Sequence, residues 1–309
     1  MTNNYKPVAI TEDFYQLGTP SFPVYLSLGD EGMIIEGGTG GVAAIIMEQL
    51  KGLGIPPERI KYIVLTHTHA DHIGAVPHLK RLLPHLKTVA SPVAARLLAS
   101  GETMKEFLRM DRTLAEIMLA KGRIAELPPQ IDNYVFAVDM VVSEGDRIDL
   151  GSGVTWTIYE TPGHSPCHIS LYNESQGIVV IGDATGFYVP EKDVFWPNYF
   201  NSLEAYCDSI RKLAALPARR GVLSHNYVIE EGLGDYFHKA MRATESYHRE
   251  MVARLGKGED VDKIALEKAR WVNTLTDDHP FEIMCSMARI LLRRSQSEAG
   301  KDNNLFDLP

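Results

Sequence analysis

The segment HTHADH, residues 67–72, constrains this chain more than any other feature, because it places three imidazoles and one carboxylate within six positions. It directly follows YIVL at 62–65, a short, apolar and largely β-branched run that is typical of a buried strand. Layered α/β folds usually build their sites on loops at the carboxyl ends of strands. The segment therefore predicts a metal-binding loop mounted on a sheet.

The spacing within this segment divides its ligands between two positions. His67 and His69 are two residues apart, so in an extended loop their side chains project to the same side and grip one ion. Asp71 and His72 follow where the chain turns into a helix, and they point toward a neighbouring position. Two metal ions are implied, and neither receives enough ligands from this loop alone.

Three later segments supply further ligands, each after a predicted strand. TPGHS carries His164, VVIGDA carries Asp183, and VLSHNY carries His225. A buried carboxylate without a partner is costly, which favours a cation beside Asp183. His168 competes with His164, but its position favours the start of the next strand. We therefore predict one ion held by His67, His69 and His164, a second held by Asp71, His72 and His225, and Asp183 bridging both.

Two blocks of strand patterns, separated by a helical stretch, predict the fold class. Strand patterns occupy the start of the chain up to the metal-binding loop, helical periodicity dominates from Ile73 to Ala120, and strand patterns return from Val141. Two such blocks with flanking helices indicate two sheets packed face to face with helices outside, an αββα sandwich of the α/β class. Residues from about Asp235 to Arg294 read as three helices. We predict a catalytic domain over residues 1–230 and a C-terminal helical cap and tail over residues 231–309.

Composition excludes several classes of protein. The net charge of −9 with dispersed basic residues argues against nucleic acid as a substrate. No run of 18 apolar residues indicates a membrane span, and the amino terminus lacks the basic and apolar segments of a secretory signal. The three cysteines are too few and too scattered for a disulfide framework. We expect a cytoplasmic protein that binds neither membranes nor nucleic acid.

HTHADH followed by GHS, GDA and a late histidine after a strand, in this order over roughly residues 15 to 230, resembles the metallo-β-lactamase superfamily and its dinuclear branch. The resemblance implies the αββα fold, two metal ions and, usually, hydrolysis. With IIEGGTG near the start and a helical extension at the end, the layout is also similar to the quinolone-signal-type thioesterases, which act on 2-aminobenzoylacetyl-CoA. The segment SHNY departs from the glycine-flanked histidine common in such proteins and resembles the His-x-Tyr arrangement of glyoxalase II-like members.

These residues predict a hydrolase of ester or thioester bonds, with an acyl-CoA as the leading substrate. Two divalent ions, of zinc, iron or manganese, would hold a bridging water that ionises near neutral pH. Asp71 would orient the resulting hydroxide and carry its proton to the leaving group, and Tyr227 is a candidate hydrogen-bond donor to the substrate carbonyl. Thiols ionise at about pH 8.5, so a thioester demands little of a general acid, whereas an amide would demand one.

Two alternatives stay open at this stage. The same site fits a lactonase or a glyoxalase II-like hydroxyacylglutathione hydrolase. A protein of another class, a regulatory interaction protein, would retain the metal site and work through its helical surface. Helices between Ser91 and Ala120 are candidates for a lid or for a homodimer contact.

Overall fold

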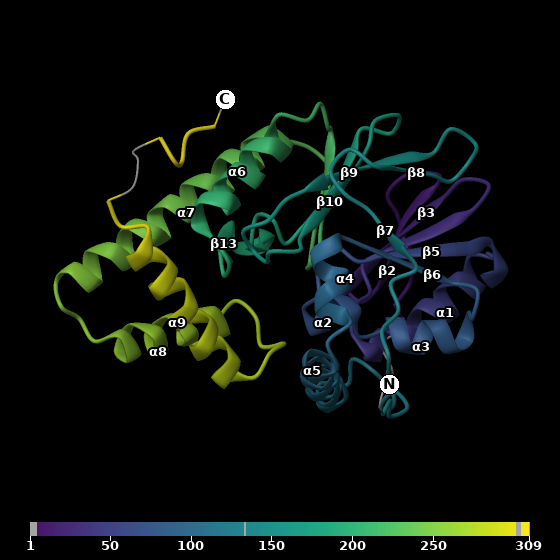
Figure 1. Cartoon of the computed structure of the whole chain (residues 1–309), viewed down its shortest axis with the longest axis horizontal. Helices are drawn as coiled ribbons and strands as arrows, with labels where there is room; N and C mark the ends of the chain where they lie inside the picture. The colour runs from purple at the N-terminus through teal and green to yellow at the C-terminus, as the bar shows by residue number, and fades with distance from the viewer. Residues whose placement is uncertain (1–4, 133, 301–303, 309) are drawn as a thin grey trace. The chain divides into compact units, whose positions relative to one another are not determined.

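The computed structural model describes residues 5–132, 134–300 and 304–308, and they form two compact units (Figure 1). The first unit comprises the described residues up to Tyr159, together with Leu171–Gln176 and Ser224–Asn226. The second comprises Glu160–Ser170, Gly177–Leu223 and the described residues from Tyr227 onward. Each unit is therefore assembled from several separate stretches of sequence.

A seven-stranded sheet with the order β1-β2-β3-β4-β5-β6-β7 lies in the first unit. Strands β1 to β4 pair antiparallel, and β4 to β7 pair parallel. Strands β3 and β4 are buried along their whole length, which agrees with their apolar sequences. The strands are β1 (Val8–Ala9), β2 (Phe14–Gly18), β3 (Pro23–Leu28), β4 (Gly32–Ile35), β5 (Ile60–Val64), β6 (Lys87–Ala90) and β7 (Met140–Val141).

The helices of the first unit follow the parallel strands. Figure 1 shows α1 and α3 beside this sheet, and α1 buries Ile46 and Leu50. Ser91 accepts a hydrogen bond from the backbone N–H of Ala94, and Pro92 occupies the first turn of α4, as that residue predicts. The helices are η1 (Gly40–Val42), α1 (Ala43–Gly52), η2 (Pro57–Arg59), α2 (Ala70–Ile73), α3 (Val76–Leu82), α4 (Pro92–Leu98) and α5 (Gly101–Ala120).

A second, six-stranded sheet has the order β15-β14-β11-β10-β9-β8. Within the first unit, the Trp156 ring of β9 lies 5.2 Å from the Phe14 ring of β2, and its Nε1 donates to Ser27 Oγ of β3 at 2.8 Å. Strand β9 of the second sheet thus faces β2 and β3 of the first sheet across a buried core, and the predicted αββα fold is confirmed. The strands are β8 (Arg147–Asp149), β9 (Thr155–Glu160), β10 (Ile169–Asn173), β11 (Ile178–Gly182), β14 (Arg220–Leu223) and β15 (Val228–Ile229).

The second unit contains the long C-terminal helices that the apolar periodicity predicts. They are preceded by α6 and by a hairpin, β12–β13, whose strands pair antiparallel. Neither this hairpin nor β15 is indicated by the sequence, because strands of two or three residues are too short to establish an alternating pattern. The elements are β12 (Phe187–Val189), η3 (Pro190–Lys192), β13 (Val194–Trp196), α6 (Leu203–Ala214), α7 (Leu233–Gly256), α8 (Val261–Asn273) and α9 (Phe281–Ser297).

In the described part of the chain, no helix combines the length and the apolar character needed to cross a bilayer.

Candidate metal centre

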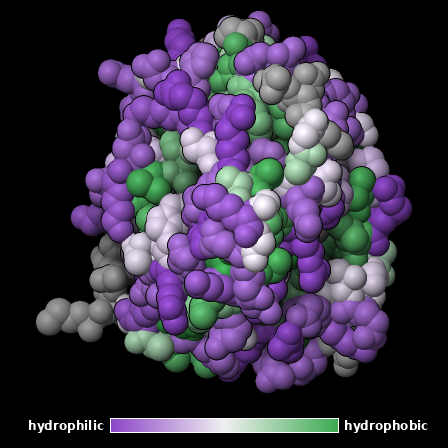
Figure 2. Space-filling model, turned by 90° about the vertical axis from the view of Figure 1, so that its left-hand side faces the viewer, coloured by the Kyte–Doolittle hydropathy of each residue, from purple (hydrophilic) through white to green (hydrophobic). Residues whose placement is uncertain are grey.

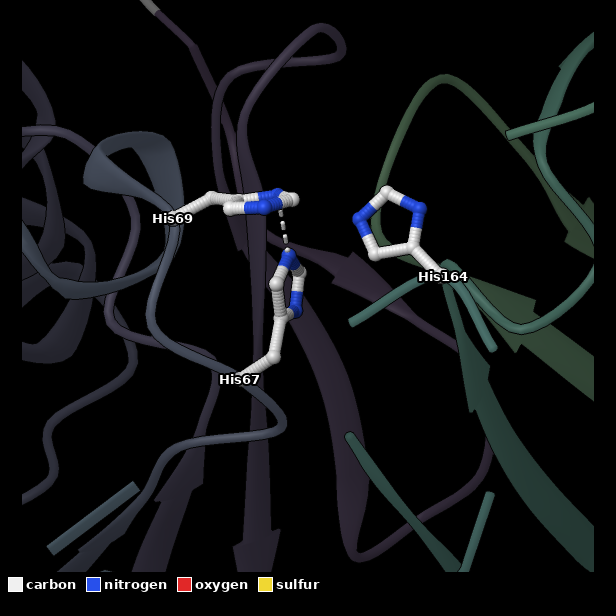
Figure 3. Close-up of side chains that lie close together, drawn as sticks. All are labelled: His67, His69 and His164. Carbon is white, nitrogen blue, oxygen red and sulfur yellow. Dashed lines mark hydrogen bonds between the residues drawn. The ribbon is translucent and has the colours of Figure 1, made fainter. Parts of the chain in front are cut away.

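The predicted metal-binding loop leaves the sheet at the carboxyl end of β5, as its sequence indicates. His67 is fully buried and His69 is half-buried at the residue preceding α2. His67 Nε2 lies 3.0 Å from His69 Nδ1, and the two rings are nearly perpendicular at 82° (Figure 3). Two imidazole nitrogens of one loop therefore lie side by side, which is the arrangement that the spacing of these histidines predicts.

Asp71, His72 and His225 come together within the first unit. One potential ligand atom of each lies within 4.8 Å of those of the other two. Asp71 Oδ2 is 3.4 Å from His72 Nε2 and 3.6 Å from His225 Nε2. His72 and His225 are more than 150 residues apart in the sequence, and the loop after β14 brings His225 to the other two residues. That loop is shaped by Asn226, whose φ is 64° and whose backbone N–H donates to the Pro20 carbonyl at 2.8 Å.

His164 and Asp183 come together within the second unit. His164 Nε2 lies 3.4 Å from Asp183 Oδ2, and both residues are buried. Figure 3 also draws His164, on its loop between β9 and β10. Gly163 precedes it with a φ of 130°, and a Cβ at this position would lie 2.3 Å from the Tyr206 Cα of α6. The turn that holds His164 therefore requires glycine, both for its backbone angle and for space.

Four of the predicted histidines are held in the same way. In each, Nδ1 lies 2.8–3.1 Å from a hydrogen-bonding atom outside the predicted ligand set, while Nε2 lies 3.0–3.6 Å from another member of that set. Such outer hydrogen bonds fix the tautomer and the ring orientation of a metal-binding histidine. The Nδ1 partners are Thr66 Oγ1 for His67, Glu36 Oε2 for His72, Asn198 O for His164 and Ser21 O for His225.

Glu36 is the residue of this region that reasoning from the sequence missed. Its side chain is buried, its φ is 78°, and its Oε2 lies 3.0 Å from His72 Nδ1. Its Oε1 accepts hydrogen bonds from Thr66 Oγ1 and Ser224 Oγ. The available signal was the position of Glu36 in IIEGGTG, at the carboxyl end of an apolar strand. Glu36 thus ties together the loops that precede His67 and His225.

His168 makes different contacts from His164, and it lies at the start of the next strand, as predicted. It lies one residue before β10, its Nδ1 is 2.8 Å from Thr161 Oγ1, and its Nε2 accepts from the backbone N–H of Asp183 at 3.0 Å. Both ring nitrogens therefore contact protein groups, and His168 anchors the loop that carries Asp183.

Tyr227 lies two residues after His225 in the chain and belongs to the second unit. It is 39% exposed, and its ring lies 5.9 Å from that of Tyr188. Tyr188 is half-buried and donates to Asp193 Oδ1 at 2.9 Å. Burial, with this hydrogen bond to Asp193, raises the pKa of Tyr188 to about 12. Of these two tyrosines, Tyr227 is thus the more exposed.

Residues 18–225 match the family model of the metallo-beta-lactamase superfamily, a stretch that runs from the end of β2 to His225 and covers more than half of the chain. The chain belongs to this superfamily.

Individual curated relatives share less than 30% sequence identity with this chain in the two examples that follow. A probable metallo-hydrolase of Bacillus subtilis is 28% identical over 167 residues, which are 52% of this chain and 51% of that protein. An atrochrysone carboxyl ACP thioesterase of Aspergillus fumigatus is 27% identical over 172 residues, 56% of this chain and 40% of that protein. The match thus spans about half, or less, of the length of these relatives.

The fold is shared with solved structures at still lower identity. A metallo-beta-lactamase family protein of Thermus thermophilus has a TM-score of 0.63 and 20% identity, over 96% of this chain and 98% of that one. The imidazole and carboxylate groups described above are of the kinds that bind divalent ions in proteins.

Proposed function

We propose that this protein hydrolyses a thioester, with acyl-CoA as the leading substrate class, at a centre of two divalent ions. The observation that supports this most is the common orientation of four histidines, with Nδ1 bonded to surrounding protein atoms and Nε2 directed at another predicted ligand. We assign His67, His69 and His164 to one ion, Asp71, His72 and His225 to the other, and Asp183 to a bridging position.

The donor set fits zinc, iron or manganese, because neutral imidazole and carboxylate groups are ligands that these ions accept. When bound, two such ions would lower the pKa of water into the neutral range and polarise the substrate carbonyl. Asp71 is suited to hold and move a proton, because it is only partly exposed and its Oδ2 lies 3.4 Å from His72 Nε2 and 3.6 Å from His225 Nε2.

The oxygen of a water attacks the thioester carbon, the C–S bond breaks, and Asp71 carries a proton from that water to the leaving sulfur. The phenol of Tyr227 donates a hydrogen bond to the carbonyl oxygen as negative charge develops there. The products are a carboxylic acid and a thiol.

A thioester is favoured over an amide because a thiolate leaves without strong acid assistance. The only proton carrier that we assign to the reacting atoms is a carboxylate, which is a weak acid catalyst for an amine leaving group. The Aspergillus relative is named a thioesterase, which supports the same bond type. The rival substrates on the same site are lactones and hydroxyacylglutathione, and the segment SHNY with Tyr227 favours the latter.

We further propose that the protein acts on a small molecule in the cytoplasm and not on nucleic acid. Residues 231–309, which contain α7, α8 and α9, would serve as a cap on a catalytic domain of residues 1–230. Helix α5 is the proposed homodimer contact or lid.

Release of free thiol from a panel of acyl-CoA and acyl-glutathione thioesters tests the proposal, with lactones assayed in parallel by acid production. We expect thiol release from acyl-CoA that disappears on chelation and in Asp183→Ala, and that persists in the control Asp262→Ala at an exposed position. Release from glutathione thioesters alone, or opening of lactones alone, would move the assignment to those substrates. A protein that binds its metals and cleaves nothing would contradict a hydrolytic role and favour the interaction protein, whose cellular phenotype would survive Asp183→Ala.

A further inference from the structure

The described residues contain a buried carboxylate that the proposed chemistry does not use. Asp111 lies in the middle of α5 and is 6% exposed, whereas the other acidic residues of this helix are exposed and pair with basic neighbours on the same helix. Burial raises the pKa of Asp111 to about 7, and the nearby charge of Asp71 also raises it. The hydrogen bond from the Gly40 backbone acts in the opposite direction and lowers this pKa. Asp111 is therefore the one buried acidic residue of α5.

The Asp111 carboxylate fills the space that two glycines leave. Its Oδ1 accepts a hydrogen bond from the backbone N–H of Gly40 at 2.7 Å. A Cβ built on Gly74 would lie 2.0 Å from Oδ1, and one built on Gly40 would lie 2.6 Å from Oδ2. Gly74 has a helical φ of −61°, so glycine is required there for space rather than for backbone conformation.

Both glycines belong to segments that carry the proposed metal site. Gly74 directly follows α2, the short helix that contains Asp71 and His72. Gly40 lies four residues after Glu36, the partner of His72 Nδ1. The two segments also bond to each other, because Gly37 N–H donates to the His72 carbonyl at 2.8 Å.

A second contact on the same face of α5 supports this connection. Met118 lies seven residues after Asp111, two helical turns further along the same face. Thr39 Oγ1 donates to Met118 Sδ at 3.3 Å. Helix α5 therefore contacts residues 39–40 through Met118 and Asp111, and Asp111 also lies against Gly74 at the end of α2.

We propose that Asp111 is a positioning residue for the second metal position, which α2 supplies with Asp71 and His72; this rests on the proposed function. The carboxylate braces Gly40 against Gly74 and thereby holds α2 in the place where Asp71 and His72 meet His225. The brace belongs to α5, an element that contributes no ligand itself.

Zinc affinity of the full-length chain, measured by competition with a chromophoric chelator well below the unfolding temperature, tests this role. We expect Asp111→Ala to weaken zinc binding at one of the two positions by about 10- to 100-fold. Asp111→Asn should restore most of the loss, because the amide oxygen still accepts from Gly40. The matched control is Glu116→Ala, an exposed carboxylate of the same helix that pairs with Arg112, and it should bind zinc like the wild type.

A third variant keeps the test decisive if Asp111→Ala does not fold. Gly74→Ala introduces a Cβ where the carboxylate lies, and we expect it to reduce zinc affinity at the same position. Variants that lose unfolding stability but keep wild-type zinc affinity would overturn the positioning role alone. A wild-type protein without zinc affinity, and equally without affinity for iron or manganese, would overturn the metal centre of the proposed function as well.

Discussion

Three imidazole rings of the candidate site are held by partners distant in the sequence, whereas His67 is held by its neighbour Thr66. The ligand types and their spacing are legible in the sequence, because HTHADH, GHS, GDA and SHNY each follow an apolar run. The hydrogen-bond partners of the histidine Nδ1 atoms could not be predicted from the sequence in this way. Ser224 Oγ donates to Glu36, 188 residues away in the sequence, and only the folded chain brings the two together.

Glu36→Gln tests the importance of these outer hydrogen bonds. The glutamine amide has one oxygen in place of two and cannot accept hydrogen bonds from His72, Thr66 and Ser224 together. The His72 ring should therefore be held less firmly. We expect metal affinity to fall about 10- to 100-fold. Chelator competition measures this, with the exposed Glu58→Gln as the control. Wild-type affinity in Glu36→Gln would show that His72 is held by other means.

His78 gives a pH dependence of stability that can be measured separately. Burial, with Arg81 nearby, lowers the pKa of His78 to about 4, whereas an unfolded histidine has a pKa of about 6.5. Between these values the unfolded chain binds the proton and the folded chain does not, so stability is lost as the pH falls through this window. Replacing His78 by Gln should reduce the difference in unfolding free energy between pH 7.5 and pH 5, measured by urea unfolding, by about 2 kcal/mol.

The control for this prediction is His238→Gln, which removes an exposed histidine. An unchanged pH dependence in His78→Gln would mean that His78 titrates normally in the folded protein.

At the scale of elements, strands with continuous apolar runs were predictable and short strands were not. The apolar run at 62–65 forms most of β5, and the apolar run in VVIGDA lies in β11. In the hairpin β12–β13, Tyr188 pairs with Phe195, and the two rings contact each other with their centroids 4.4 Å apart. Such a pair becomes recognisable only once the turn at η3 is known, because three-residue strands carry no period.

Gly163→Ala tests how α6 positions the loop of His164. The substitution places a Cβ against the backbone of Tyr206 and forces a φ of 130° on alanine, so we expect a loss of about 3 kcal/mol or more in unfolding free energy. The matched control is Gly153→Ala, where φ is 79° but no atom lies within 4 Å of the new Cβ. Conformational cost alone should limit that loss to about 1 kcal/mol. Urea unfolding of both variants measures the difference, and equal losses would contradict a close approach of α6.

For the whole molecule, the order of the motifs along the chain predicted the superfamily, and the family model over residues 18–225 confirms it. The ligand assignments stay predictions, since each unit contributes a part of the set: His67, His69, Asp71, His72 and His225 from the first, His164 and Asp183 from the second. The acyl group of the substrate was not predictable, because shape and polarity of a binding pocket arise from side chains that no short motif records.

Removal of metal should destabilise the whole protein. Ions that bind only the folded chain stabilise it by mass action, so chelation should lower the melting temperature of the wild type. In Asp183→Ala, which lacks the proposed bridging ligand, chelation should lower it less. Differential scanning calorimetry with and without chelator measures both, and identical shifts in the two proteins would argue against a bridging role.

Anomalous diffraction from crystals grown with zinc would locate each bound ion and its ligands. We predict two peaks about 3.5–4 Å apart, one bound by His67, His69 and His164, the other by Asp71, His72 and His225, with Asp183 bound to both. A single peak, a peak elsewhere on the surface, or a pair of peaks that leaves His164 and Asp183 uncoordinated would contradict it.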